Sequence, residues 1–208
     1  MVRSKKELEI LLSLVPGFRN PVIELEQYVC DSSIASELMW LAYIRGDIED
    51  KVVLDLGCGT GVLSYAALIL GAKYVLCIDI DIEALSIAKE FLWNEFNNVE
   101  MINMGVENME LKRVDTIVMN PPFGVHRKGI DMVFLRKALE LQPHAVYTIH
   151  KYNPESHKIV IDVVSSYGYQ VDNVVVKDMK IPPIYPMHRR RVYRFKVAIY
   201  GIVKRRYA

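Results

Sequence analysis

The stretch Val52-Val53-Leu54-Asp55-Leu56-Gly57-Cys58-Gly59-Thr60-Gly61-Val62 determines the expected fold. Residues 52–56 are typical of a buried strand, and the glycines that follow permit a tight turn into a helix over about residues 62–70. The free N–H groups at the start of such a helix can bind an anionic or polar ligand. A strand, a glycine-rich turn and a helix in this order therefore predict a nucleotide or nucleoside site.

Two further residues narrow the expected ligand. The dinucleotide fingerprint requires its third glycine where this chain has Val62, which weakens the case for a pyrophosphate. Asp79 ends the next apolar run, about 20 residues further on, where a carboxylate can accept hydrogen bonds from both ribose hydroxyls. This combination favours a nucleoside without phosphates, such as S-adenosylmethionine. A glycine-rich turn that serves only tight packing is the alternative.

Apolar runs and amphipathic segments alternate on both sides of this stretch. The predicted strands are 52–56, 74–78, 99–102, 116–119, 145–149, 170–177 and 193–203, and the predicted helices between them are 62–70, 82–93, 130–141 and 155–167. Strands separated by such helices pair in parallel, and right-handed crossovers give a Rossmann-like, doubly wound, seven-stranded α/β sheet. The last two strands are joined by a loop, 179–191, without a helix, so the last strand is expected to be antiparallel.

The first 46 residues precede this alternation. They contain two predicted helices, over 4–15 and about 34–45, and an irregular stretch over 18–31. A chain of 208 residues suits one sizeable α/β domain. We therefore expect an N-terminal helical extension, residues 1–46, that packs on a single domain formed by residues 47–208.

A second motif, Asn120-Pro121-Pro122-Phe123, follows the fourth predicted strand. Neither proline can donate to a strand ladder, so the strand ends here and the Asn120 amide is held at its carboxyl end, where open α/β sheets bind ligands. An amide oxygen, a rigid carbonyl and an aromatic ring can together bind the amino group of a planar nitrogen base. Taken alone, the same four residues also fit an ordinary turn.

Composition and charge limit the class of protein. No apolar run reaches the ~18 residues of a membrane span. The three cysteines, Cys30, Cys58 and Cys77, lack metal-like spacing, which predicts reduced thiols, no metal site and a cytoplasmic protein.

The charge is distributed unevenly along the chain. Residues 1–178 carry 17 basic and 25 acidic side chains, whereas the 30 residues after them carry nine basic side chains and no acidic one. A basic segment on an acidic body favours a polyanionic partner, although a solvated face is also compatible with it. The predicted RNA-binding residues are Arg189, Arg190, Arg191 and Arg194.

With these motifs in order, the chain resembles the class I S-adenosylmethionine-dependent methyltransferases. Leu25-Glu26-Gln27-Tyr28, Asn120-Pro-Pro-Phe-Gly, Lys128-Gly129-Ile130-Asp131-Met132 and His150-Lys151 make it similar to the RNA adenine methyltransferases of the methyltransferase-like protein 5 family and their archaeal relatives. The resemblance implies N6-methylation of one adenosine in small-subunit ribosomal RNA. It also implies that residues 120–123 hold the target base.

The resemblance implies a set of cofactor contacts as well. The expected cofactor-binding residues are Gln27, Gly57, Gly59, Thr60, Gly61, Val62, Asp79, Gly105 and Val106. The chain departs from the family at Val29-Cys30, where a Pro-Thr pair is frequent, and at Gly105-Val106, where an acid is frequent. The adenine contact of the cofactor is therefore expected from backbone groups or from Glu107.

The residues alone are also compatible with other substrates and with a non-catalytic function. Guanine N2 and a protein glutamine amide present a similar planar amine, and a non-catalytic RNA-binding subunit would keep the same fold.

The eukaryotic relatives work with a small zinc-containing activator protein, and residues 99–102 are expected at a sheet edge that a partner strand could extend. His126, His150 and Lys151 are expected to be structural rather than catalytic.

Overall fold

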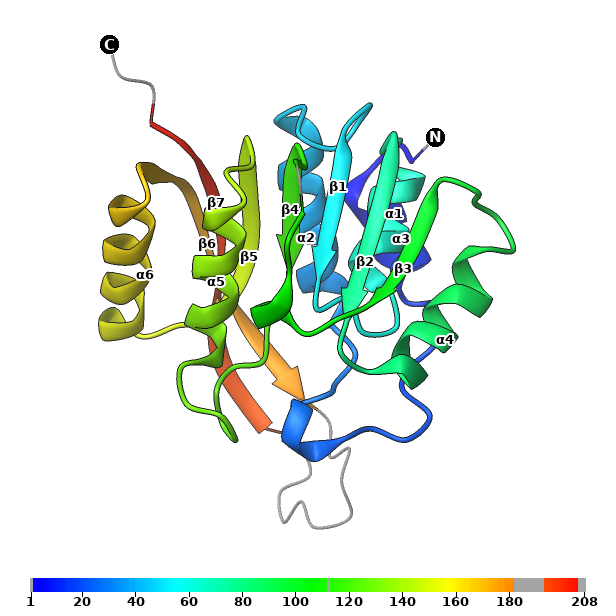
Figure 1. Cartoon of the computed structure of the whole chain (residues 1–208), viewed down its shortest axis with the longest axis horizontal. Helices are drawn as coiled ribbons and strands as arrows, with labels where there is room; N and C mark the ends of the chain where they lie inside the picture. Colours follow the sequence, from blue (N-terminus) through cyan, green and yellow to red (C-terminus); the bar gives the residue numbers. More distant parts are fainter. Residues whose placement is uncertain (1, 112, 182–192, 206–208) are drawn as a thin grey trace.

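The fold is built on one seven-stranded sheet (Figure 1). The computed structural model describes residues 2–111, 113–181 and 193–205. The strands are β1 (Val52–Leu56), β2 (Tyr74–Asp79), β3 (Val99–Asn103), β4 (Thr116–Met119), β5 (Ala145–Lys151), β6 (Tyr169–Ile181) and β7 (Tyr193–Lys204). Their order is β3-β2-β1-β4-β5-β7-β6, and the pairs are parallel except for the two made by β7. The predicted mostly parallel sheet with an antiparallel last strand is confirmed.

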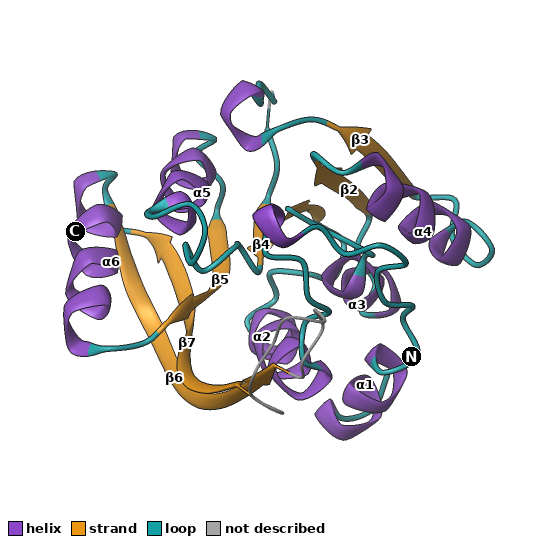
Figure 2. Cartoon of the chain, turned by 90° about the horizontal axis from the view of Figure 1, so that it is seen from below, coloured by secondary structure: helices purple, strands orange, loops and turns teal. Residues whose placement is uncertain are grey.

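Helices cover both faces of the sheet (Figure 2). They are α1 (Lys5–Leu12), α2 (Ser32–Ile44), α3 (Val62–Ile69), α4 (Ile82–Leu92), α5 (Ile130–Glu140) and α6 (Pro154–Ser166), with short 3-10 turns η1 (Ile23–Leu25) and η2 (Val106–Asn108). One hydrophobic core packs helices α1, α2, α3 and α4 against one face of the sheet. A second core packs α5 and α6 against the other face. This two-sided arrangement is the predicted doubly wound architecture.

The N-terminal helices share the core of the sheet. Leu8 and Leu12 of α1 and Leu38 of α2 are fully buried in the same cluster as the apolar residues of α3 and β5. The segment that follows α2 is also anchored, because the Asp47 carboxylate accepts a hydrogen bond from Tyr147 Oη on β5 at 2.6 Å. The helices pack on the domain, and a boundary at residue 46 stays a prediction.

The last two strands are longer than the sequence indicates. The β6–β7 ladder continues to the pair Ile181 and Tyr193, so the expected loop 179–191 is wrong in its first part. Met179 shows the physical reason, since it is buried against the sheet where a loop residue would be exposed. Residues 182–192 lie outside the described part of the chain.

The strand order positions the ligand site. β1 lies between β2 and β4, so the chain crosses the sheet in opposite directions on the two sides of β1, and a crevice opens at the carboxyl ends of these strands. The Asp115 carboxylate accepts a hydrogen bond from Val52 N at 2.9 Å and fixes the start of β1 against β4. Within the described residues, no helix has the length and apolar character needed to cross a membrane.

Candidate active site

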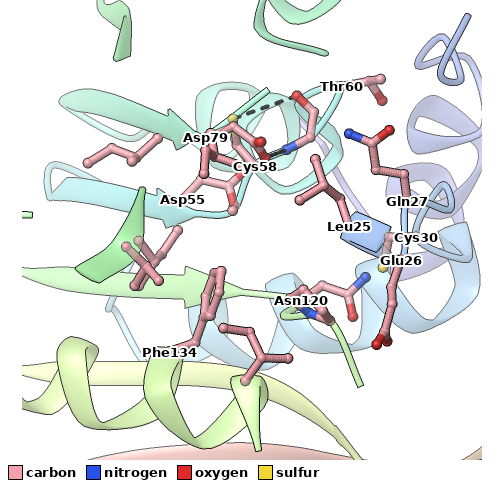
Figure 3. A pocket seen from close by; sticks show the side chains of 18 of the residues that line it. Leu25, Glu26, Gln27, Cys30, Asp55, Cys58, Thr60, Asp79, Asn120 and Phe134 are labelled. Carbon is pink, nitrogen blue, oxygen red and sulfur yellow. Dashed lines mark hydrogen bonds between the residues drawn. The ribbon is translucent and has the colours of Figure 1, made fainter. Parts of the chain in front are cut away.

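A cavity of about 190 Å³ opens at the carboxyl ends of β1, β2 and β4. Four segments enclose it: the glycine-rich turn, the segment after β3, the start of the Asn120 motif, and the strap, which we define as residues 22–30. Figure 3 shows Asp55 and Asp79 on one side of the cavity, Gln27 and Cys30 across from them, and Asn120 and Phe134 below. Predicted site residues that line it are Gln27, Gly57, Gly59, Thr60, Val62, Asp79, Gly105, Val106, Asn120 and Pro122.

The glycine-rich turn brings the backbone close to this cavity. Gly57 and Gly59 have φ angles of +75° and +54°, and a Cβ on them would lie 2.8 Å from Phe134 and 2.9 Å from Phe18. A side chain at either position would therefore be strained and would clash. Gly61 differs, since it does not line the cavity and packs against Ala88 and Leu92 of α4. Tight packing accounts for this glycine, and its contact with the cofactor stays a prediction.

Asp79 holds the turn in place. Its carboxylate accepts hydrogen bonds from Gly59 N at 2.8 Å and from Asp81 N at 2.9 Å. Burial raises the pKa of Asp79 above its usual value, and these backbone donors partly oppose the rise. Each oxygen keeps a second lone pair, so the carboxylate can still accept from vicinal ribose hydroxyls.

Asp55 is a cavity-lining carboxylate that the sequence reasoning missed. Its Oδ2 accepts from Ser64 N at 2.8 Å and from Ser64 Oγ at 2.6 Å, whereas its Oδ1 is buried and has no partner among the described residues. Burial raises the pKa of Asp55 to about 7, the two Ser64 hydrogen bonds oppose the rise, and the charge of Asp79 adds to it. An unpaired carboxylate oxygen here fits the α-ammonium group of a methionine moiety. The sequence feature that could have identified Asp55 is its position directly before Leu56-Gly57.

The strap is fixed by polar contacts of Glu26 and Gln27. Gln27 is buried, accepts a hydrogen bond from Val22 N at 2.7 Å and donates to the Asp81 carboxylate at 2.6 Å. Glu26 has a left-handed backbone with a φ of +52° and accepts from His126 N at 2.8 Å. These contacts join the strap to α4 on one side and to the loop after Phe123 on the other, which makes it a wall of the cavity.

The segment after β3 forms the remaining side. Gly105 and Val106 line the cavity beside Met104, and their contact with the adenine of a cofactor stays a prediction. Glu107 lines it as well, but its carboxylate pairs with Arg127 at 2.6 Å. This exposed ion pair bridges the segment after β3 and the loop after the Asn120 motif.

Asn120 is held as predicted, directly after β4. Its Oδ1 is buried and has no hydrogen-bond partner among the described residues. Buried polar atoms are generally paired, so an unpaired acceptor that lines a cavity indicates a ligand with a donor group. Pro122 lines the cavity with Asn120, while Pro121 and Phe123 do not.

The aromatic ring next to the cavity is Tyr28. Phe123 stacks on Tyr28 with ring centroids 5.6 Å apart and an interplanar angle of 22°, and it meets Phe195 edge to face at 5.3 Å. Tyr28 lines the cavity and Phe123 does not, and the stacking of Phe123 on a target base stays a prediction. The contact of Tyr28 with Phe123 joins segments about 95 positions apart, and no local pattern indicates it.

The predicted basic surface is described only in part. Arg194 is exposed at the start of β7, and Arg189, Arg190 and Arg191 lie outside the described residues. Lys151, at the end of β5, places its Nζ 5.8 Å from the centre of the Phe195 ring. A cation therefore lies beside the aromatic group that contains Phe123.

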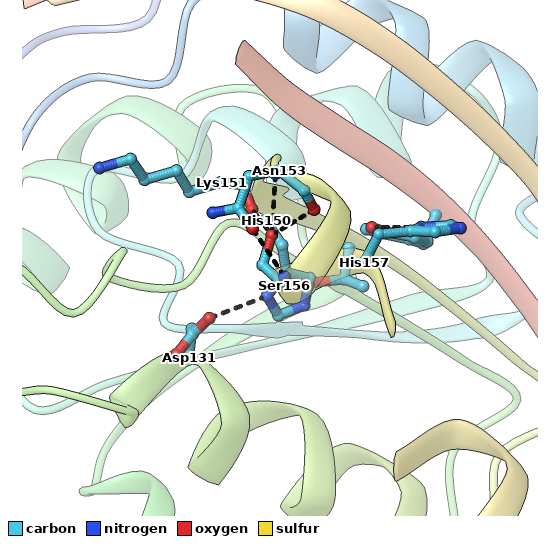
Figure 4. Close-up of polar contacts among 8 residues, drawn as sticks. Asp131, His150, Lys151, Asn153, Ser156 and His157 are labelled. Carbon is cyan, nitrogen blue, oxygen red and sulfur yellow. Dashed lines mark hydrogen bonds and ion pairs between the residues drawn. The ribbon is translucent and has the colours of Figure 1, made fainter. Parts of the chain in front are cut away.

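His150 and its neighbours have structural contacts (Figure 4). His150 is buried and bonds Thr148 Oγ1 at 3.0 Å and the Asp131 carboxylate at 3.3 Å. Asp131 lies at the start of α5, so this pair joins the end of β5 to the helix that follows the Asn120 loop. Among the described residues there is no group of three or more His, Cys, Asp or Glu side chains able to hold a metal ion.

Comparison with known proteins gives consistent matches. The methyltransferase small domain family matches residues 34–144. The chain is 36% identical to the rRNA N(6)-adenosine-methyltransferase METTL5 of Danio rerio, over 89% of this chain and 92% of the relative. An uncharacterized protein of Methanocaldococcus jannaschii is 37% identical over 96% and 94% of the two chains. A crystal structure from Pyrococcus horikoshii, of a protein proposed to be an RNA methyltransferase, superposes with a TM-score of 0.91 at 44% identity, covering 98% of this chain and 99% of that one.

The fold and the site thus define a class I methyltransferase that uses S-adenosylmethionine. The chain belongs to the methyltransferase family that includes METTL5.

A test of the ribose contact is Asp79→Asn. This change keeps the size of the side chain and removes the charge that strengthens its hydrogen bonds, so we expect S-adenosylmethionine affinity to fall about 10- to 100-fold. Calorimetry on the wild type, on Asp79→Asn and on Asp162→Asn, an exposed change on α6, measures this. Equal affinity for all three proteins would contradict the assignment.

Asp55 predicts a pH dependence of stability. Its folded pKa of about 7 lies above the ordinary value of 3.8, so the folded state holds more protons than the unfolded state between these values. Stability therefore falls as pH rises through about 4 to about 7. Asp55→Asn removes this contribution, and urea unfolding should show the variant gaining stability relative to the wild type at pH 8 but not at pH 4. A stability difference that is independent of pH would contradict a raised pKa.

Proposed function

We propose that this chain transfers a methyl group to N6 of an adenosine in ribosomal RNA, and specifically in small-subunit ribosomal RNA. The observation that carries the proposal is the buried, unpaired Oδ1 of Asn120 beside the cofactor cavity. Support for the RNA substrate comes from the relatives named rRNA N(6)-adenosine-methyltransferase in Danio rerio, Drosophila melanogaster and Caenorhabditis elegans.

The Asn120 motif accounts for the chemistry. The N6 lone pair of adenine is delocalised into the ring, so N6 is a poor nucleophile. Asn120 Oδ1 and the Pro121 carbonyl would accept the two N6 hydrogens, favour a tetrahedral nitrogen and orient its lone pair. When bound, S-adenosylmethionine supplies an electrophilic methyl group on a sulfonium. Transfer of this methyl group would form an N–C bond at N6 and break the S–C bond of the donor, and one N6 proton would pass to water.

This mechanism needs orientation more than it needs a base. The product nitrogen is acidic immediately after transfer, so no side chain with a raised pKa is required to deprotonate it. Proximity and a fixed hydrogen-bond acceptor supply most of the rate enhancement. His150 is not among the residues that line the cavity, and its ring nitrogens bond Thr148 and Asp131.

A partner strand is a further part of the proposal. β3 is an edge strand with half-buried Met101 and Ile102, so it can accept another chain by strand addition. We propose that a small zinc-containing activator protein pairs there. The test is methyl transfer by the isolated chain and by the chain co-expressed with such a protein. Full activity of the isolated, soluble chain would refute the need for a partner.

The main test is Asn120→Ala. Loss of the acceptor should reduce single-turnover methyl transfer to small-subunit ribosomal RNA by about 100-fold, because the acceptor matters only when a base is bound. Cofactor affinity and unfolding should be unchanged. Mass spectrometry of the wild-type product should identify N6-methyladenosine. A methylguanosine product, or methylation of protein glutamine, would favour the alternative substrates. Near-normal transfer by Asn120→Ala would show that the motif is only a turn.

Phe123 variants separate packing from chemistry. Phe123→Tyr should keep most activity because the ring is retained, whereas Phe123→Ala should raise the RNA concentration needed and slow turnover, because it removes the support behind Tyr28. Single-turnover rates over a range of RNA concentrations measure both effects.

RNA binding by the basic residues can be tested through the salt dependence of the affinity. Arg189, Arg190, Arg191 and Arg194 are proposed to bind phosphates around the target nucleotide. Changing all four to Ala should reduce the slope of log affinity against log salt by about one unit per lost contact. Arg19→Ala, which removes an exposed ion pair with Glu90 on α4, is the matched control. An unaltered slope would show that the arginines form a solvated face.

A further inference from the structure

Buried polar atoms without partners gather at this cavity. Among the described residues, four buried side-chain oxygens lack a hydrogen bond of good geometry, and three of them belong to cavity-lining residues. Asp55 Oδ1 and Asn120 Oδ1 are assigned above to the cofactor and the target amino group. The third atom, Tyr28 Oη, contacts neither group in the proposed mechanism.

Tyr28 lies where a target base would be recognised. It lines the cavity together with Asn120, its ring stacks on Phe123, and its hydroxyl lies next to the Asn120 amide. The strap contacts of the two preceding residues, Glu26 with His126 and Gln27 with Asp81, hold the backbone before Tyr28 in place. Tyr28 is therefore a fixed ring whose hydroxyl lies next to the Asn120 amide without making a well-aligned hydrogen bond.

The hydroxyl is suited to donate. Burial raises the pKa of Tyr28 well above its usual value, with Cys30 and Glu26 adding to the rise and the Asn120 amide opposing it. The group therefore keeps its proton throughout the physiological range. A buried hydroxyl donor beside a buried amide acceptor fits a ligand edge that presents an amino group next to a ring acceptor.

Adenine presents such an edge, and guanine does not present it in the same way. The amino group of adenine is flanked by N1 and N7, which only accept, whereas N1–H, a donor, lies on one side of the guanine amino group. N1 of adenine lies across the ring from the sugar, and N7 lies nearer to it. A base inserted from the RNA backbone therefore brings N1 deepest, toward a hydroxyl that is itself buried.

We propose that Tyr28 reads the target base, its hydroxyl donating a hydrogen bond to N1 of the adenine whose amino group Asn120 accepts. The proposal rests on the proposed function and adds a residue that selects adenine over guanine at the same site.

Methylated ribosomal RNA is first cleaved into fragments to locate the target adenosine, and a short synthetic RNA is then made with adenosine, 1-deazaadenosine or 7-deazaadenosine at that position. Single-turnover transfer is measured for the wild type and Tyr28→Phe, which keeps the ring on Phe123. Tyr65→Phe, a ring on α3 that does not line the cavity, is the control for loss of a hydroxyl. Cofactor affinity and unfolding are measured for each variant to confirm that it folds.

The proposal predicts one specific pattern. The wild type should be about tenfold or more slower on 1-deazaadenosine than on adenosine and little changed on 7-deazaadenosine. Tyr28→Phe should be about tenfold slower on adenosine and should no longer distinguish adenosine from 1-deazaadenosine. The ratio between the two RNAs, compared between the two proteins, cancels the altered nucleophilicity of the analogue.

Two results would overturn the proposal. One is a Tyr28→Phe protein that discriminates against 1-deazaadenosine as strongly as the wild type does. The other is a wild-type loss on 7-deazaadenosine but not on 1-deazaadenosine, which can be seen even if Tyr28→Phe fails to fold. A wild-type chain that methylates no adenosine in any RNA would refute the proposed function itself, and the two failures are therefore distinguishable.

Discussion

The hydrogen bond from Gly59 N to the Asp79 carboxylate organises the site. It joins the turn after β1 to the end of β2 and places a carboxylate, rather than a main-chain carbonyl, at the crevice between the two strands. The bond requires a left-handed backbone at Gly59 and no side chain there, because Phe18 fills the space a Cβ would take. The sheet order, the α3 N-terminus and the strap around Gln27 are arranged around this junction.

The cavity combines two functions on neighbouring strands. β1 and β2 carry Asp55 and Asp79, which fit the amino-acid and ribose ends of the cofactor, while β4 ends in Asn120, which fits the group to be methylated. The strap closes the space between them and carries Tyr28 onto Phe123. One short segment thus contacts both the cofactor side and the base side, so the two binding events are expected to be coupled through its position.

Local sequence patterns predicted much of this arrangement and failed where distant segments meet. The alternation of strands and helices indicated the sheet, and the absence of a helix before β7 indicated its direction, because both follow from the length of each connection. The contact between Tyr28 and Phe123 and the burial of Met179 depend on tertiary packing, which periodicity does not encode. Asp55 could have been recognised from its position before the glycines, but only the structure shows that one of its oxygens is unpaired. The domain boundary, the partner and the three arginines of residues 189–191 stay predictions.

The central claim is that the Asn120 side chain is held ready, with a free acceptor, for the amino group of an extruded adenine. The most direct measurement is a crystal structure of the chain with S-adenosylhomocysteine and a short RNA carrying the target adenosine. The account predicts adenine N6 within about 2.7–3.2 Å of Asn120 Oδ1. A base bound elsewhere, with Asn120 Oδ1 paired to a protein group, would contradict it.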